Sequence, residues 1–530
     1  MAVREFGNKM MEINARRIGE EKKKKRGLEQ QQQKKKKTIK RSVSSSPVYV
    51  VMLAIFSRFV ILALFVFWRI LARPYDTSAG LTRPCLSPNQ NDHQVNVKWK
   101  TVGSVIENGV VWDSVYYVQI AQCGYEYEQT HAFLPVLPLT MRFLANTVLS
   151  RLVPRVGYRA TLAIAGYLIS NMAFVYAALY LYKLTLYVVE DERQAWHATA
   201  LFCFNPASVF YSSIYSESLF AFCSFAGLWN FVKGSKWMAI VLWGLSSGVR
   251  SNGVLHAGFF LFQSMHYCHQ AALSQQRRLR GVLAVVTAIM QSGAVVTPFV
   301  AFQFYGYYQH CDPSVGSVEE LRPWCTARLP YLYGFVQKHY WNVGFLRYFE
   351  IKQIPNFMLA SPMLALAICS LISYGKQQSR LLLSLGFRAT PMEWGKLVLS
   401  PTLEQKHVKY IDDNCSADNG QLQQRQQTKI ERTIAEEHGL ANPDGLGSFF
   451  SPAAVCFLVQ LAVMTSVACL IMHVQVATRF LSVSPPIYWY AAHVMDPSVG
   501  GRPMGRLIWA IFFSYLGLGS LLFINFYPFT

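Results

Sequence analysis

Residues 48–71 read VYVVMLAIFSRFVILALFVFWRIL, and this stretch decides the fold class. Its 24 residues are apolar apart from Tyr49, Ser57, Arg58 and Arg69. One helix of this length crosses about 30 Å of hydrocarbon. The stretch is too long for the core of a cleaved signal peptide, and no small-residue cleavage site follows it. We therefore expect an uncleaved membrane anchor.

The segment before this anchor is strongly basic. Residues 1–47 hold 15 Lys/Arg and 5 Asp/Glu, about half of the chain's net charge of +21. Two basic clusters flank the glutamine run 30–33, a composition that predicts a disordered tail. Such clusters also occur in nuclear signals, but here a membrane helix follows directly, so no nucleic-acid partner is expected. The positive-inside rule places residues 1–47 in the cytoplasm and the chain after Leu71 in the lumen.

The rest of the chain continues this pattern, with 52% hydrophobic and only 15% charged residues. Polar loops separate the apolar runs, which predicts an all-α polytopic membrane protein with about ten membrane segments. Four of these runs are shorter than about 17 residues and can instead form two longer, kinked helices. The segments after the anchor are 160–182, 196–211, 219–232, 237–247, 254–265, 281–305, 354–373, 452–473 and 507–526.

Counting these segments in turn predicts the side of each loop. The basic residues Arg277, Arg278 and Arg280 mark one cytoplasmic loop. The count gives a catalytic membrane region with luminal loops, a flexible cytoplasmic insert, and C-terminal membrane segments around a further luminal loop. It places the C-terminus in the cytoplasm. The catalytic membrane region is 48–373, with luminal loops 72–159 and 306–350. The cytoplasmic insert is 374–451, and the C-terminal membrane region is 452–530, with luminal loop 474–506.

The first luminal loop carries a candidate general base. Asp113 lies beside Trp112 and Tyr116, and a carboxylate among aromatic rings suits a proton acceptor for a sugar hydroxyl. Asp113 also fits a helix N-cap, because a helix-compatible run follows it. Glu126 and Glu128 come next, and either position the acceptor or are simply solvated.

Glu217 and Arg250 each lie between two apolar stretches. Placing an ionised side chain within the membrane region costs at least about 2.5 kcal/mol of free energy. Each of these two residues therefore needs an ion-pair partner, contact with water or a function. They either pair with each other across the hairpins or bind substrate, and the two roles are compatible. Asn252 follows Arg250 in a Gly-rich turn and joins the candidate binding residues.

Two later segments place cations near the luminal edge. His339, Trp341 and Arg347 lie in an aromatic-rich stretch that also fits an interfacial belt with snorkelling cations. His473 and Arg479 flank a helix end and are suited to hold a lipid-linked phosphate. The chain has no Gly-rich nucleotide loop, so a cytosolic nucleotide substrate is not expected.

The 11 cysteines lack CxxC spacing, so no metal site is expected. Most of those within apolar segments serve as small apolar fillers. Cys311 and Cys325 fall in one luminal loop, and an oxidising lumen allows a disulfide between them.

Several motifs together resemble the GPI mannosyltransferase 2 (PIG-V) family. They occur in order over about residues 50–373 and 452–527, outside the basic tail and the insert. One mild departure is Leu134, where the family often has a second Phe. The motifs are Trp112-Asp113, Gly124-Tyr125-x-Tyr127-Glu128, Ala132-Phe133-x-Pro135-x-x-Pro138, Asn205-Pro206, Tyr215-Ser216-Glu217-x-Leu219-Phe220-Ala221, Gly248-Val-Arg250-Ser251-Asn252-Gly253, His339-Tyr-Trp-Asn-Val-Gly344-Phe345, and residues 475–489.

This resemblance implies a GT-C glycosyltransferase of the endoplasmic reticulum with a luminal site. It implies dolichyl-phosphate mannose as donor, a GPI-precursor glycolipid as acceptor, no required cofactor, and transfer of the second mannose in α-1,6 linkage. It makes Asp113 the catalytic carboxylate, and it allows a small accessory membrane subunit. A lipid transporter or flippase, a membrane scaffold, and a GT-C enzyme with another lipid-linked or protein acceptor are the alternatives. The expected substrate-binding residues are Trp112, Tyr116, Glu126, Glu128, Glu217, Arg250, Asn252, His339, Trp341, Arg347, His473 and Arg479.

Overall fold

The computed structural model describes residues 47–75, 85, 97–273, 278–311, 322–399, 449–497, 499 and 501–529. The basic tail and most of the 374–451 insert therefore lie outside the described residues. Contacts divide the chain into two units, Met1–Met52 and Leu53–Thr530; the N-terminal helix begins in the first, and the contacts described below all lie within the second. Helices, turns and irregular chain make up the described residues, which include no strand.

Six helices are long and apolar enough to cross a membrane, which confirms an all-α polytopic membrane protein. A seventh span is possible by the same measure if the bent pair Val136–Asn146 and Ser150–Val156 counts as one. The six are the N-terminal helix Pro47–Leu71, α6 (Tyr158–Val189), α12 (Arg278–Cys311), α14 (Ile354–Gln377), α19 (Val455–Leu470) and α22 (Gly501–Ile524).

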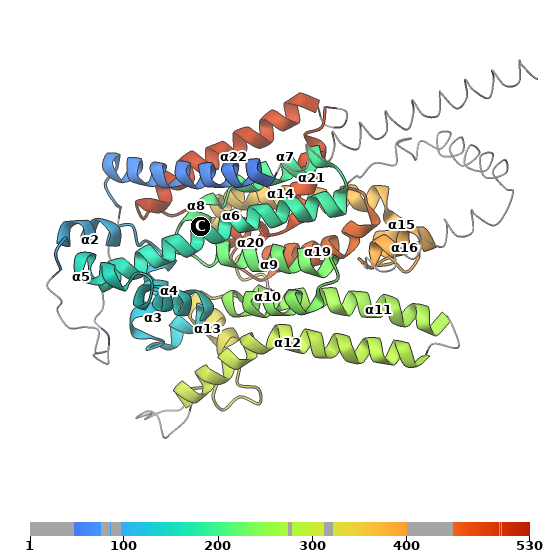
Figure 1. Cartoon of the computed structure of the whole chain (residues 1–530), viewed down its shortest axis with the longest axis horizontal. Helices are drawn as coiled ribbons and strands as arrows, with labels where there is room; N and C mark the ends of the chain where they lie inside the picture. Colours follow the sequence, from blue (N-terminus) through green and yellow to red (C-terminus); the bar gives the residue numbers. More distant parts are fainter. Residues whose placement is uncertain are drawn as a thin grey trace, which may run out of the picture. The chain divides into compact units, whose positions relative to one another are not determined.

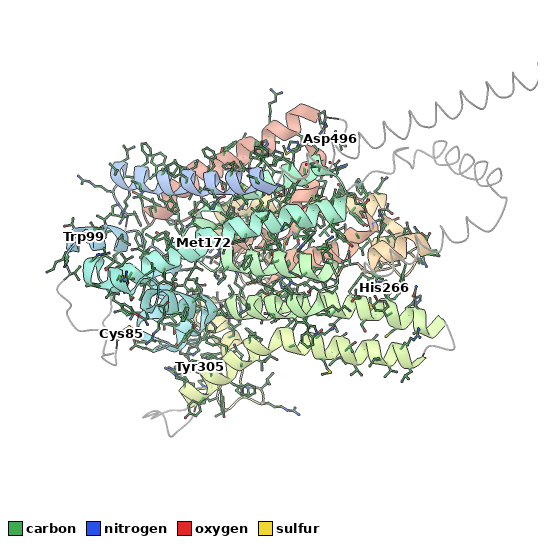
Figure 2. All side chains as sticks on the ribbon, in the orientation of Figure 1. Cys85, Trp99, Met172, His266, Tyr305 and Asp496 are labelled. Carbon is green, nitrogen blue, oxygen red and sulfur yellow. A yellow bond between two sulfur atoms is a disulfide. The ribbon has the colours of Figure 1, made fainter. Side chains whose placement is uncertain are left out.

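The other four expected spans, between residues 196 and 265, form helices of fewer than 18 residues. They pack beside α6 and α12, and side chains fill the spaces between the helices (Figures 1 and 2). Chain breaks at Pro206, Tyr215 and Arg250 end them early, and each break places polar groups inside the protein. These elements are α7 (Glu192–Cys203), α8 (Ser208–Ser212), α9 (Glu217–Val232), α10 (Lys236–Val249), η5 (Ser251–His256) and α11 (Ala257–Leu273).

Shorter elements connect the long helices and form much of one end of the bundle. They are α2 (Lys100–Glu107), α3 (Asp113–Cys123), η3 (Glu128–Ala132), α4 (Val136–Asn146), η4 (Ser150–Leu152), α5 (Val153–Val156), α13 (Leu332–Trp341), η7 (Ile351–Gln353), α15 (Ser379–Leu383), α16 (Pro391–Leu397), η8 (Pro452–Ala454), η9 (Val474–Val476), α20 (Ala477–Leu481) and α21 (Pro485–Val494).

The N-terminal helix and α22 run side by side in the same direction (Figure 1). The indole Nε1 of Trp68 donates to Ser520 Oγ at 3.1 Å, and Arg69 Nη1 donates to the Ile524 carbonyl at 3.1 Å. The C-terminal end of the chain therefore lies next to the end of the N-terminal helix.

The side of the membrane on which the C-terminus and the loop 474–506 lie stays a prediction. After α19 the short helices α20 and α21 lead the chain back along the bundle. His493, near the end of α21, packs against Phe450, which precedes α19, with ring centroids 5.1 Å apart. Helix α22 then returns the chain to the other end. Helices α20 and α21 are each too short to count as a candidate span, and Pro485 is the first residue of α21.

Arg58 of the N-terminal helix fixes the break between α7 and α8. Its side chain is buried, and Nη2 donates to the Cys203 carbonyl at 2.8 Å while Nη1 donates to the Ser208 carbonyl at 3.0 Å. The guanidinium also lies 3.7 Å from the ring centre of Phe174. Arg58 thus satisfies carbonyl groups that the interrupted helices leave without partners.

We expect Arg58→Met to destabilise the protein, because two buried carbonyls lose a charged donor. Each unsatisfied group costs about 1–3 kcal/mol. The midpoint of thermal unfolding in detergent measures the effect. Arg151→Met, at an exposed position, is the matched control and should change the midpoint little. An unchanged midpoint for Arg58→Met would show that water or another group replaces the guanidinium.

Candidate active site

Asp113 is positioned by an unusual backbone turn. It is the first residue of α3, and the preceding Trp112 has φ 53° and ψ −129°. Such a conformation costs a non-glycine residue on the order of 1–3 kcal/mol, so neighbouring groups must hold it. The Asp113 amide donates to Tyr215 Oη at 3.0 Å, and Trp112 Nε1 donates to the Phe523 carbonyl at 3.1 Å. The N-cap of α3 is Trp112 rather than Asp113, and the Asp113 carboxylate instead accepts from Arg479.

Three other charged residues come from helix ends that meet Asp113. Glu217 is the first residue of α9, after the break that contains Tyr215. Arg250 is the extended residue after α10, with φ −146° and ψ 144°. Arg479 lies in the five-residue helix α20. Interrupted helices thus bring four charged side chains to one place.

The four side chains form a continuous chain of ion pairs with alternating sign. Arg479 Nη1 lies 2.8 Å from Asp113 Oδ2, and Arg479 Nε lies 3.7 Å from Glu217 Oε1. Glu217 Oε1 also pairs with Arg250 Nη1, as one interpretation of the sequence predicted. Only 1% of the Glu217 side chain is exposed, against 32% for Asp113. The two carboxylates and two guanidiniums compensate each other, so the unliganded site is close to neutral.

Aromatic rings support the central cation. The Arg479 guanidinium lies 5.3 Å from the Phe210 ring centre and 5.6 Å from that of Tyr215. Burial alone would lower the pKa of Arg479, but the charges of Asp113 and Glu217 outweigh burial and raise that pKa. Arg479 therefore remains charged throughout any working pH range.

These charged groups line a cavity of about 430 Å³. That volume suits one or two sugar rings with a phosphate, since small-molecule sites span roughly 300–1,000 Å³. The wall of the cavity also carries neutral polar side chains. Eight predicted residues line the cavity: Trp112, Asp113, Glu217, Arg250, Asn252, Trp341, His473 and Arg479.

A family profile described as "Mannosyltransferase (PIG-V)" matches residues 47–530. The chain belongs to this mannosyltransferase family. It is therefore a glycosyltransferase, and the resemblance drawn from its motifs is confirmed.

Relatives from animals and fungi agree with this membership. "GPI alpha-1,6-mannosyltransferase 2" of Cricetulus griseus is 32% identical over 405 residues, covering 73% of this chain and 72% of that protein. The Homo sapiens protein of the same name is 30% identical over 478 residues, covering 79% and 87%. "GPI mannosyltransferase 2" of Chaetomium globosum is 33% identical over 329 residues, covering 56% and 69%.

Five predicted binding residues of this mannosyltransferase lie outside the cavity lining. Tyr116 stacks on Phe133, with ring centroids 4.7 Å apart, and His339 stacks on Phe335 at 5.0 Å. Arg347 donates to Asn342 Oδ1 at 3.1 Å. Phe133 lines the cavity, but Phe335 and Asn342 do not, so only Tyr116 of these three packs on a lining residue. The remaining two are Glu126 and Glu128.

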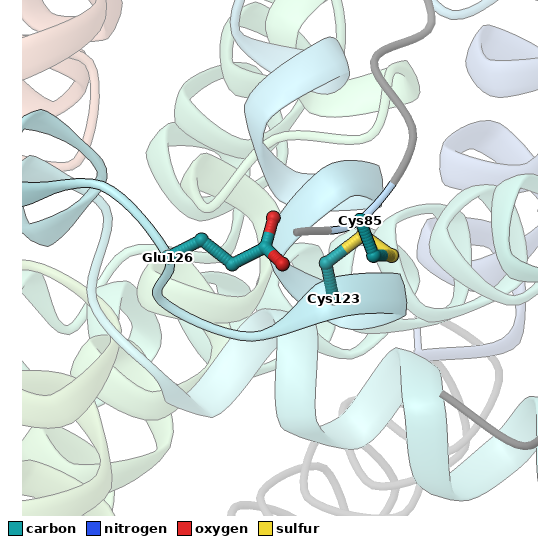
Figure 3. A group of neighbouring side chains, drawn as sticks. All are labelled: Cys85, Cys123 and Glu126. Carbon is teal, nitrogen blue, oxygen red and sulfur yellow. A yellow bond between two sulfur atoms is a disulfide. The ribbon is translucent and has the colours of Figure 1, made fainter. Parts of the chain in front are cut away.

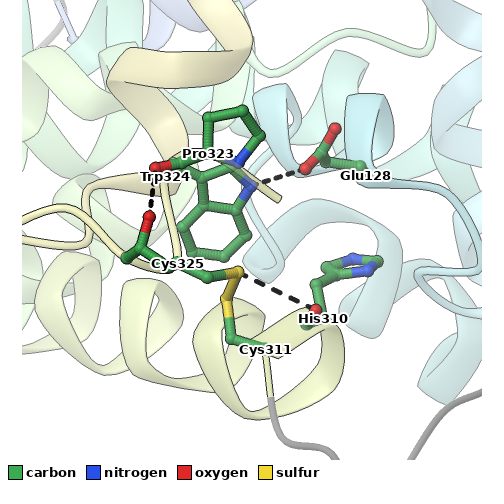
Figure 4. Close-up of a disulfide and its surroundings, with 7 residues drawn as sticks. Glu128, His310, Cys311, Pro323, Trp324 and Cys325 are labelled. Atoms are coloured by element: carbon green, nitrogen blue, oxygen red, sulfur yellow. Dashed lines mark hydrogen bonds between the residues drawn. A yellow bond between two sulfur atoms is a disulfide. The ribbon is translucent and has the colours of Figure 1, made fainter. Parts of the chain in front are cut away.

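Glu128 is hydrogen-bonded to residues next to a disulfide. Trp324 Nε1 donates to Glu128 Oε1 at 2.6 Å (Figure 4). The Tyr340 hydroxyl donates to Glu128 Oε2 at 2.8 Å. Cys325, next to Trp324, forms a disulfide with Cys311, with Cα atoms 5.6 Å apart. Both oxygens of Glu128 are thus occupied by protein donors.

A second disulfide joins Cys85 to Cys123, with Glu126 beside it (Figure 3). The ligand atoms of these three residues lie within 4.8 Å of one another. Both sulfurs are bonded to each other, however, so neither can act as a thiolate ligand for a metal. This disulfide was not predicted, although both cysteines fall in the predicted luminal loop 72–159.

Several lining residues were also missed. Gln337, Asn356 and Gln475 face the same cavity as Asp113. Tyr348 links two of them, because its hydroxyl donates to Gln475 Oε1 at 3.0 Å and accepts from Asn356 Nδ2 at 2.9 Å. The sequence gives no energetic reason to single out an uncharged amide. Gln475 could still have been found, because it lies between the predicted residues His473 and Arg479.

Proposed function

We propose that this chain transfers the second mannose, in α-1,6 linkage, from dolichyl-phosphate mannose to a GPI-anchor intermediate. The family and the names of the relatives support the reaction class. The observation that carries the assignment to a site is the position of Asp113, whose carboxylate reaches the cavity while Arg479 holds it. A carboxylate and two guanidiniums around one cavity are the groups that transfer from a sugar phosphate needs.

The reaction is a single in-line displacement. The acceptor 6-hydroxyl oxygen bonds to the anomeric carbon as the bond from that carbon to the phosphate oxygen breaks. The hydroxyl proton passes to Asp113, and the bonding electron pair leaves with the phosphate. One displacement inverts a β-linked donor to an α-linked product. Phosphate is a stable anion, so the leaving group needs positive charge rather than a proton donor.

Arg479 and Arg250 are the groups that supply this charge. Arg479 contacts both Asp113 and Glu217, and it exchanges partners when an anionic donor enters the cavity. Withdrawal of Arg479 from Asp113 toward the phosphate makes the carboxylate a stronger base as the leaving group is bound. His473, also on the cavity wall, packs on Tyr348, the residue that links Asn356 and Gln475, with ring centroids 4.5 Å apart. The scheme requires no metal and no cofactor.

The neutral polar wall suits the acceptor glycan. Gln337, Asn356 and Gln475 offer amide donors and acceptors, and Trp341 offers a ring for a sugar face. Hydroxyl groups of a sugar bind such neutral partners without the desolvation cost of a charged group. This division assigns the ion-pair side to the donor phosphate and the amide side to the acceptor sugars.

Arg250 provides a direct test of the phosphate role. We expect Arg250→Lys to lower turnover at saturating donor by about 10-fold or more, because lysine offers a point charge in place of a planar fork. A membrane assay with saturating dolichyl-phosphate mannose measures this, with Arg151→Lys as control. Wild-type turnover by Arg250→Lys would remove Arg250 from the phosphate site. Loss of the protein in Arg250→Ala would instead reveal its structural pairing with Glu217.

The proposal places the site on the luminal face of the endoplasmic reticulum membrane. The basic residues 1–47 support this orientation through the positive-inside rule. We expect an Asn-x-Thr sequon introduced in the 78–100 loop to be glycosylated, and one near Gln421 to remain unmodified. The natural Asn414-Cys415-Ser416 sequon, which lies outside the described residues, should also be unmodified. A gel shift after enzymatic deglycosylation reports each site, and modification near Gln421 would contradict the orientation.

Complementation tests the whole assignment. Cells that lack the second GPI mannosyltransferase should regain surface GPI-anchored protein when they express this chain. Analysis of their lipid intermediates should show the mannosylated product. Membership of a mannosyltransferase family argues against the transporter and scaffold hypotheses. Failure to complement, with the protein present in membranes, would favour another acceptor or the need for an accessory membrane subunit, which co-purification would detect.

A further inference from the structure

We propose that the last residues of the chain, 523–529, are a positioning element of the active site. They hold Trp112, and through Trp112 they set the direction of the Asp113 carboxylate. This inference rests on the proposed function, because it assigns a role in catalysis to residues that do not carry out the chemistry. It also places the C-terminal end on the same side of the membrane as Asp113.

The C-terminal segment makes direct contact with Trp112. The Phe523 carbonyl accepts the indole N–H of Trp112 at 3.1 Å, and the Phe526 ring packs against the indole with centroids 5.8 Å apart. The Phe523 ring also packs on Tyr215 at 5.6 Å, and Tyr215 accepts the Asp113 amide. The two hydrogen bonds that fix the Trp112–Asp113 turn therefore both depend on groups that contact this segment.

The segment is itself firmly anchored, although it ends the chain. The Asn525 carbonyl accepts the Tyr75 amide at 2.9 Å, and the neighbouring Ile524 carbonyl accepts from Arg69. Phe523 is 2% exposed, and Phe526 is 6% exposed. This burial and these hydrogen bonds hold the segment in one position beside Trp112.

The last part of the segment folds back over α22 into the cavity wall. Pro528 and Phe529 both line the cavity. The Phe529 ring stacks on Phe210, which also lies beneath the Arg479 guanidinium. A Cβ atom at Gly519 would lie 2.5 Å from the Phe529 ring, so the glycine permits this close return. The segment thus supports both members of the Asp113–Arg479 pair.

Without these contacts Trp112 can leave its left-handed backbone conformation, and Asp113 then turns away from the acceptor hydroxyl. Displacement of a catalytic group by about 1 Å is enough to cost 100-fold in rate. The donor phosphate, which faces Arg250 and Arg479, keeps most of its contacts. We therefore expect a change in kcat with little change in KM for the donor.

The test compares Phe526→Ala with Phe526→Tyr and with Leu518→Ala, an exposed apolar truncation on α22. The assay is mannosyl transfer by the full-length protein in membranes with dolichyl-phosphate mannose. We expect Phe526→Ala to lower kcat about 10–100-fold with KM within about threefold, Phe526→Tyr to restore most of kcat, and Leu518→Ala to match wild type within about twofold. Deletion of residues 528–530 is the second variant and should also lower kcat. Wild-type kcat in both Phe526→Ala and the deletion would overturn the proposal.

A glycan tag gives a readout that does not depend on activity. A sequon joined to the C-terminus by a flexible Gly/Ser linker should be glycosylated if residue 529 faces the lumen. The sequon in the 78–100 loop serves as the positive control for that side. An unmodified C-terminal tag together with a modified control would overturn the placement. Absence of transfer by the wild-type protein, with the C-terminal tag modified, would instead refute the proposed function and leave the placement intact.

Discussion

Asp113→Asn lowers mannosyl transfer by about 10²–10⁴-fold, the usual contribution of a general base. The amide keeps the size of the side chain and the turn at Trp112, so the protein should still accumulate in membranes. The variant cannot accept the proton of the acceptor hydroxyl, and the effect should therefore appear in kcat. Low-level expression in cells lacking the second GPI mannosyltransferase, followed by flow cytometry for surface GPI-anchored protein, measures the loss.

Glu190→Gln is the matched control, because Glu190 forms an exposed ion pair with Lys396 at 2.8 Å, away from the cavity. Its transfer activity should equal that of the wild type. Near-normal surface GPI-anchored protein with Asp113→Asn at low expression would remove Asp113 as the base. Glu217 would then be the only other carboxylate on the cavity wall among the described residues.

Arg479→Met should lower both activity and stability, because it leaves Asp113 and Glu217 close together without the cation between them. Breaking a buried ion pair costs about 3–5 kcal/mol, and only 16% of the Arg479 side chain is exposed. Loss of a donor to the leaving phosphate adds a decrease in kcat of about 10²–10³-fold. Thermal unfolding in detergent and transfer in membranes measure the two effects separately.

A second substitution separates charge balance from catalysis. Arg479→Met combined with Asp113→Asn removes one charge of each sign, so it should recover part of the lost stability but none of the activity. Arg380→Met breaks an exposed pair with Glu393 and should cost less than about 1 kcal/mol. If Arg479→Met alone unfolds at the wild-type temperature, the ion-pair chain does not stabilise the fold.

The long helices were predictable because each contains enough consecutive apolar residues to span a membrane. The shorter ones were not, since their ends are fixed by contacts with distant residues. Arg58 donates hydrogen bonds to the carbonyls of Cys203 and Ser208, which are 145 and 150 residues away. No local sequence pattern predicts these hydrogen bonds. The same cause hid the short helices α20 and α21, which lie within the predicted loop 474–506.

The site was predictable residue by residue but not as an arrangement. Glu217 and Arg250 were identifiable because a charge in an apolar region needs a reason. The pairing of Asp113 with Arg479 joins residues 366 positions apart, which sequence reasoning alone does not supply. Glu128 was predicted to position the acceptor or to be solvated, but donors from Trp324 and Tyr340 occupy its oxygens.

The hydrogen bond from Trp112 to the Phe523 carbonyl also has a consequence for the order of events during biosynthesis. Its two ends are separated by 411 residues. A ribosome that adds about 5–20 residues per second reaches Phe523 roughly 20–80 s after Trp112. Throughout that time the nascent chain already contains Asp113 but lacks the group that orients it. The enzyme therefore becomes competent only after Phe523 has been added, and a chain released before that point is inactive even though Asp113 and Arg479 have already been made.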